Sequence, residues 1–148
     1  MWLGNLTRVT TIFLKNNNFT GQIPSSLSFL KDLTLIDLSY NNFEGNISNF
    51  LTNLTKLTQA SLSYNQLTGQ ICEFQLSNSL EFLELNNNRL YGYIPKSISN
   101  LLNLTKLDIS SNNLSGMVEF DKFTKLEKLE SLDLSYNTQF LSIKSNTR

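Results

Sequence analysis

The sequence predicts an α/β solenoid, a right-handed coil of roughly 24 residues that repeats and stacks on itself. When the repeats are aligned on one another, three positions at which the same residue type recurs predict this fold. The first holds leucine or valine with spacings of 24, 24, 23, 24 and 25 residues, at Val9, Leu33, Leu57, Leu80, Leu104 and Leu129. An asparagine follows each of these starts by eight residues, and five of the six glycines fall four residues later still. We expect one domain over residues 1–148.

Each complete repeat contains one strand. The unit L-x-x-L-x-L-x-x-N-x-L-x-G-x-I has a full copy in residues 33–47. There Ile36 and Leu38 alternate with polar residues, which is typical of a half-buried strand. Because one coil cannot bury its own leucines, neighbouring coils stack and share a core. This arrangement places the strands in a parallel sheet on the concave face of the solenoid.

The asparagine column predicts a hydrogen-bonded ladder along the stack. An asparagine side chain has two donors and an acceptor, which suits backbone groups of its own and the neighbouring coil. Glycine at the next column permits a turn that a Cβ would obstruct. The predicted ladder consists of Asn17, Asn41, Asn65, Asn88, Asn112 and Asn137.

The convex side is predicted to hold short 3₁₀, helical or extended segments. Pro24 and Pro95 fix φ on this side, and leucines three residues apart, such as Leu27 and Leu30, suit a short inward-facing turn. The charged segment 119–130 is predicted to be a short outer helix, with Asp121 and Lys125 four residues apart.

The composition excludes several classes of function. The 12 basic and 12 acidic residues cancel, which is not the charge of a nucleic-acid or anionic-membrane binder. The chain has no histidine and one cysteine, Cys72, so imidazole chemistry and an internal disulfide are excluded. No apolar run is long enough to span a membrane, and the N-terminus lacks a signal-peptide pattern. We expect a binding protein without cofactor or metal rather than an enzyme.

The block N-x-F-T/E-G-Q/N-I, with Ile23-Pro24 and Ile94-Pro95, resembles the plant-specific leucine-rich repeat. Residues 112–137 abandon Ile-Pro and resemble a stretch of the Cf-type receptor-like proteins. This resemblance implies a plasma-membrane-anchored extracellular domain, active in defence or developmental signalling. It also implies a peptide or protein ligand and a co-receptor kinase as a second partner. Membrane attachment would come from parts of a parent protein outside this sequence.

The phase of the repeats predicts a fragment. Residues 1–8, with Leu3 and Leu6, match the tail of a repeat whose strand is missing, and residues 144–148 are expected to be disordered. Both ends of the core would then lack caps. Alternatives are a short self-contained protein, a relative of the polygalacturonase-inhibiting proteins, or a truncated remnant without function of its own.

Ligand contacts are expected at the outward positions of the strands. Aromatic side chains contribute much of the binding energy of protein interfaces, and several of these positions are aromatic. The candidates are Phe13, Lys15, Leu35, Tyr40, Tyr64, Phe82 and Glu84. Tyr40 and Tyr64 should stack one coil apart. In the alternative interpretation, the recurring Asp-Leu-Ser-Tyr-Asn is part of the repeat framework. A carboxylate column of Glu84, Asp108 and Asp133 could also serve glycosidase chemistry or bind Ca²⁺.

Six Asn-x-Ser/Thr sequons are compatible with a secreted parent protein. They begin at Asn5, Asn18, Asn46, Asn53, Asn103 and Asn113. Asn46 and Asn53 are the best candidates for glycosylation, because both lie outside the predicted strand face.

Overall fold

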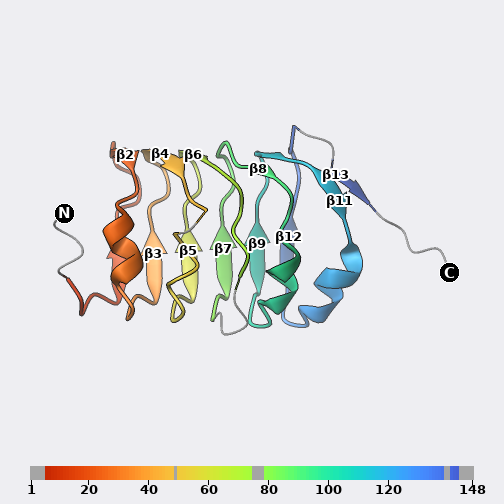
Figure 1. Cartoon of the computed structure of the whole chain (residues 1–148), viewed down its shortest axis with the longest axis horizontal. Coiled ribbons are helices and arrows are strands. Elements are labelled where there is room, and N and C mark those ends of the chain that lie inside the picture. The colour runs from red at the N-terminus through yellow and green to blue at the C-terminus, as the bar shows by residue number, and fades with distance from the viewer. Residues whose placement is uncertain (1–5, 49, 75–78, 139–140, 144–148) are drawn as a thin grey trace.

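A computed structural model describes residues 6–48, 50–74, 79–138 and 141–143. Its main element is a parallel sheet with one strand from each repeat, in the order β1-β3-β5-β7-β9-β12. Figure 1 shows the strands β3 to β12 side by side across the middle of the molecule. Their bounds are β1 Thr11–Phe13, β3 Leu35–Asp37, β5 Gln59–Ser61, β7 Phe82–Glu84, β9 Lys106–Asp108 and β12 Ser131–Asp133.

The register of this sheet keeps equivalent residues of neighbouring repeats together. Ile12 pairs with Ile36, which pairs with Ala60, and the same column continues through Leu83 and Leu107. These central residues are buried, whereas the residues on either side of them point outward. The alternation predicted from the sequence therefore separates a core side from a strand face.

A second set of parallel strands follows the asparagine column and lies along one edge of the molecule (Figure 1). They are β2 Thr20–Gln22, β4 Asn42–Asn46 and β6 Gln66–Thr68, then β8 Tyr91–Gly92 with β10 Asn113–Leu114, and β11 Gly116–Val118 with β13 Leu141–Ile143. Glycine is required in these coils. Gly69 has a φ of 94°, and a Cβ there would collide with the side chain of Asn46.

In the described part of the chain, the convex side carries the 3₁₀ helices η2 Ser25–Phe29, η3 Lys96–Asn100 and η4 Phe120–Lys125. Pro24 and Pro95 immediately precede two of them with φ of −59° and −63°, as the sequence predicts. Helix η4 covers the start of the predicted outer helix at 119–130. An ion pair at the start of this helix joins Lys122 to Glu119 at 3.0 Å.

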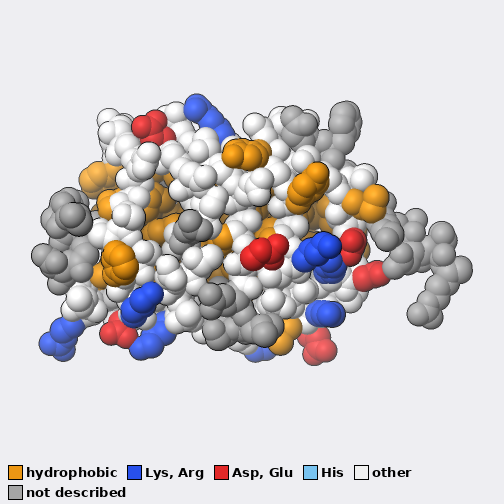
Figure 2. Space-filling model, viewed as in Figure 1, with side chains coloured by type: hydrophobic (Ala, Val, Ile, Leu, Met, Phe, Trp, Pro, Cys, Tyr) orange, Lys and Arg blue, Asp and Glu red, His pale blue; other side chains and the backbone are white. Residues whose placement is uncertain are grey.

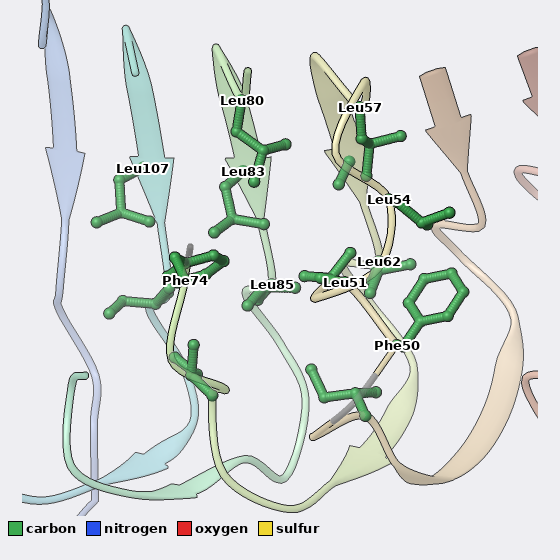
Figure 3. Close-up of a cluster of buried hydrophobic side chains, with 14 of the residues drawn as sticks. Phe50, Leu51, Leu54, Leu57, Leu62, Phe74, Leu80, Leu83, Leu85 and Leu107 are labelled. Atoms are coloured by element: carbon green, nitrogen blue, oxygen red, sulfur yellow. The ribbon is translucent and has the colours of Figure 1, made fainter. Parts of the chain in front are cut away.

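The core lies between the main sheet and the convex segments. Figure 3 shows leucines of both layers filling this space together with Phe50 and Phe74. These two phenylalanines are 8% and 4% exposed and hold the place in repeats 2 and 3 where repeats 1 and 4 have Ser26 and Ser97. Large apolar side chains thus fill the convex layer of repeats 2 and 3, which both lack the Ile-Pro pair.

In repeats 2 to 6 the ladder asparagine joins its own coil to the preceding one. Asn112 is 2% exposed; its amide nitrogen donates to the carbonyls of Leu85, Ile109 and Ser110 at 3.0–3.2 Å. Its Oδ1 accepts the backbone N–H of Leu90 at 3.0 Å. Asn41, Asn65, Asn88 and Asn137 accept in the same way from Phe19, Phe43, Leu67 and Leu114. Asn17, in the first repeat, bonds only to Leu14 and Lys15 of its own coil among the described residues.

The residue before each ladder asparagine has a left-handed backbone. Its φ lies between 52° and 59° in all six repeats, at Asn16, Tyr40, Tyr64, Asn87, Ser111 and Tyr136. A side chain with a Cβ adopts this region only at a cost of roughly 1–2 kcal/mol. The sequence did not indicate this conformation, because three of the six residues are tyrosines, which do not favour it.

We expect Asn112→Ala to lower the free energy of unfolding by roughly 3 kcal/mol, because it leaves the Leu90 N–H buried without an acceptor. The matched variant Asn17→Ala should lose less than about 1 kcal/mol, since Asn17 is exposed and receives no bond from another coil. Urea unfolding followed by circular dichroism measures both. Equal losses would contradict the bridging role of the ladder.

Candidate functional site

The candidate site is the strand face, defined as the outward positions of the six repeats on the main sheet. Of the seven predicted contact residues, four lie in its strands, namely Phe13, Leu35, Phe82 and Glu84. The other three follow the ends of β1, β3 and β5 and are Lys15, Tyr40 and Tyr64. Phe13 is 66% exposed and Phe82 38% exposed, although both are large apolar side chains. Exposed aromatic groups on an ordered sheet are suited to contact a partner.

Four of these residues surround one depression over β5. It has a volume of about 160 Å³ and is lined by Phe13, Leu35, Ile36, Asp37, Gln59, Ala60, Ser61, Phe82 and Glu84. The depression exists because the side chains of β5 are small or unbranched, whereas a phenylalanine lies on either side of this strand. Phe13 lies two coils away on one side, and Phe82 lies one coil away on the other. A dry cavity of about 150 Å³ holds benzene, so this space suits one apolar side chain.

Tyr40 and Tyr64 form a stacked pair beside the sheet. Their ring centroids are 4.3 Å apart with an interplanar angle of 10°, as the repeat spacing predicts. The ammonium group of Lys15 lies 5.6 Å from the Tyr40 ring centroid, within range of a cation–π interaction. The neighbouring Tyr40 hydroxyl raises the pKa of Tyr64, so the Tyr64 phenol stays a neutral hydrogen-bonding group near pH 7.

The carboxylate column is present in the predicted register, with Glu84 beside Asp108 and Asp108 beside Asp133. Glu84 binds Lys106 at 2.5 Å, and this hydrogen bond raises the pKa of Lys106. Asp133 Oδ1 accepts from the hydroxyl and the N–H of Ser135, which lowers the pKa of Asp133.

Asp37 and Asp108 bond to the serines two residues on in the same manner. These bonds give the Asp and Ser of the repeated Asp-Leu-Ser-Tyr-Asn a framework role. The geometry therefore favours structural turns over a catalytic pair or a Ca²⁺ site.

A second hollow, which the sequence did not indicate, lies on the convex side. Its volume is about 760 Å³, and its walls include Cys72, Tyr93, Pro95, Met117 and Phe123. The hollow begins in repeat 3, which has Ile71-Cys72 in place of Ile-Pro. This repeat is also one residue shorter than the two repeats before it. Burial raises the pKa of the Cys72 thiol, so this cysteine behaves as a small apolar group.

The predicted glycosylation sites lie away from the strand face. Asn46 ends β4 and is exposed, with its Oδ1 accepting from the N–H and hydroxyl of Ser48. Asn53 is exposed on the convex side. Asn5 lies outside the described residues.

Within the described part of the chain, no group of three or more side chains is arranged to hold a metal ion. Nor does that part contain a helix with the length and apolar character needed to cross a membrane.

Comparisons with known proteins agree with this geometry. A leucine-rich-repeat family profile matches residues 78–139, and a second one matches residues 8–30 and 32–54. No curated protein sequence matches the chain. Many solved structures share the fold.

Two similar structures are large receptors from Arabidopsis. The ectodomain of the membrane receptor kinase GASSHO1/SCHENGEN3 from Arabidopsis thaliana, in complex with CASPARIAN STRIP INTEGRITY FACTOR 2, is 35% identical with a TM-score of 0.86. The receptor kinase HAESA, in complex with the peptide hormone IDA and the co-receptor SERK1, is 35% identical with a TM-score of 0.87. The chain is covered to 93% in both matches but spans only 16% and 23% of those receptors.

A shorter relative is matched over most of its length. In the complex of BIR3 and SERK2 from Arabidopsis thaliana, the matching chain is 32% identical with a TM-score of 0.72. The match covers 88% of this chain and 70% of that one. Together with the parallel sheet, the asparagine ladder and the two profiles, this relative shows that the chain belongs to the plant-type leucine-rich-repeat proteins.

Proposed function

We propose that this chain is a non-enzymatic segment of a plant receptor-like ectodomain that binds a peptide or protein ligand in defence or developmental signalling. The observation that carries the proposal is the depression over β5, which Phe13 and Phe82 border on an ordered sheet. Rigid aromatic anchors bind with little loss of side-chain entropy. The stacked pair of Tyr40 and Tyr64 adds a second ordered group beside the depression.

The similar receptors support the rest of the proposal. HAESA is in complex with a peptide hormone and a co-receptor, so we extend a peptide ligand and a co-receptor kinase to the parent of this chain. The parent would act at the extracellular face of the plasma membrane. The departure from Ile-Pro at residues 117–120 supports a Cf-type relationship. The chain itself would form one domain, with repeats starting at residues 9, 33, 57, 80, 104 and 129.

Selection from a random 12-residue peptide library, with the purified chain as bait, tests the binding role. We expect peptides that bind the strand face, identified by protection of β3, β5 and β7 in hydrogen exchange. Phe82→Ala should then weaken binding roughly tenfold, the effect of truncating one aromatic anchor.

The matched control is Phe29→Ala on η2, which removes an equally large ring, 68% exposed, from the convex side. It should leave binding unchanged. If no peptide is selected, or if protection maps to the convex hollow, the proposed site is wrong. Binding of a fungal polygalacturonase without any peptide binding would favour an inhibitor instead.

We also propose glycosylation of Asn46 and Asn53, because both are exposed and lie off the strand face. We expect the chain, secreted from insect cells behind a foreign signal peptide, to shift on a gel after treatment with a peptide-N-glycosidase. Asn46→Gln and Asn53→Gln should each remove one glycan. Asn42→Gln, outside any sequon, is the control and should migrate like the parent. An unchanged shift in either sequon variant would exclude that site.

A further inference from the structure

The strand face is divided electrostatically along the solenoid. In repeats 1 to 3 its charged side chains are Lys15 and Asp37, which cancel. Repeats 4 to 6 carry one ammonium group, Lys106, against five carboxylates: Glu81, Glu84, Asp108, Glu130 and Asp133. This half of the face therefore has a net charge of −4, although the whole chain is neutral.

The negative charge is available at neutral pH. Lys106 pairs with Glu84 and compensates for one carboxylate only. The serine bonds that hold Asp133 keep its pKa below the ordinary value, so it remains ionised. Glu81 and Glu130 are exposed at the start of their strands.

Basic side chains near the strand starts do not cancel this charge. They lie in the loops that lead into the strands, and two of them are already engaged. Lys56, which precedes the strand of repeat 3, forms an ion pair with Asp32 at 2.6 Å. Lys128 donates to the neutral amide of Asn103 at 2.7 Å and keeps its positive charge, so that the acidic half with this lysine included still has a net charge of −3. The side of the molecule seen in Figure 2 mixes both signs of charge and shows only small separate hydrophobic patches.

The neutral half of the face is the apolar half. It holds the depression over β5, and Tyr40 and Tyr64 stack beside it. The two halves meet at β7, where Phe82 borders the depression and Glu84 faces the acidic repeats. A ligand that lies across this boundary would contact the apolar depression on one side of β7 and the negatively charged repeats on the other.

We infer that the ligand of this face is an extended cationic peptide with one large apolar side chain that enters the depression and with Lys or Arg side chains that lie over repeats 4 to 6. This inference rests on the proposed function and names the chemical class of its ligand. Charge complementarity selects the class, because unlike potentials speed association and like charges exclude wrong partners.

The strand spacing sets where the basic residues fall. Neighbouring strands are about 4.8 Å apart, so β9 and β12 lie roughly 10 and 14 Å from β5. An extended peptide advances about 3.3 Å per residue, and alternate side chains face the sheet. Residues two and four positions from an apolar residue in the depression therefore lie roughly 7 and 13 Å along the peptide, between β7 and β9 and near β12, over the acidic repeats. Either chain direction satisfies this spacing.

The library selection described above tests the inference through the sequences it returns. We expect strand-face binders to be enriched in Lys or Arg two and four positions from a large apolar residue. A defined probe is the selected peptide with the highest affinity, compared with the same peptide carrying Glu at its basic positions. The charge-reversed peptide should bind at least tenfold more weakly, and the affinity of the cationic peptide should fall as salt rises.

Two matched double variants locate the effect. Glu81→Gln with Glu84→Gln removes two carboxylates from the acidic repeats and should weaken the cationic peptide roughly three- to tenfold. Glu44→Gln with Glu127→Gln removes two exposed carboxylates elsewhere and should change binding less than twofold. Circular dichroism shows that both variants are folded before binding is measured.

The outcomes separate the two proposals. Strand-face binders that are neutral or acidic would overturn the cationic ligand and leave the binding role intact. Equal weakening by both double variants would also overturn it, since the effect would follow total charge rather than the acidic repeats. The absence of any binder would overturn the proposed function itself.

Discussion

The fold depends on one interaction, the bridge that the ladder asparagines of repeats 2 to 6 make between consecutive coils. A solenoid buries the backbone of its turns, and every buried N–H or C=O left without a partner costs roughly 1–3 kcal/mol. Asn112 satisfies one N–H and three carbonyls with a single side chain. No other uncharged side chain except glutamine offers two donors and an acceptor, and glutamine is longer. Asparagine fits this role and holds the position in all six repeats.

This bridge also fixes the geometry around it. The chain must turn sharply before the asparagine, which forces the preceding residue to positive φ in all six repeats. It must turn again at the glycine, where a Cβ would strike the adjacent coil, as at Gly69 and Gly116. The strands are left in register at the spacing of the coils. The outward positions of the strand face take no part in these bridges, so they can vary for binding.

Much of this could be predicted from the sequence, because it follows from columns of like residues. The strand positions, the stack of Tyr40 on Tyr64 and the turns after Pro24 and Pro95 are of this kind. What could not be predicted depends on departures from the repeat. Phe50 and Phe74 fill the convex layer of two repeats that lack Ile-Pro, and the depression over β5 depends on side chains from four coils. The charge division is visible only once the strand face is known.

The tyrosines that precede ladder asparagines occupy a position whose backbone serves the fold and whose side chain is free to serve binding. The turn needs positive φ, and Asn16 and Asn87 meet it with a residue that favours this region. Tyr136 has the same φ at 84% exposure, so ring stacking does not cause the conformation. Stacking of Tyr40 on Tyr64 contributes roughly 1 kcal/mol, comparable to the strain at one of the two positions. The backbone thus requires the turn but not tyrosine, and the identity of these rings is open to selection by a ligand.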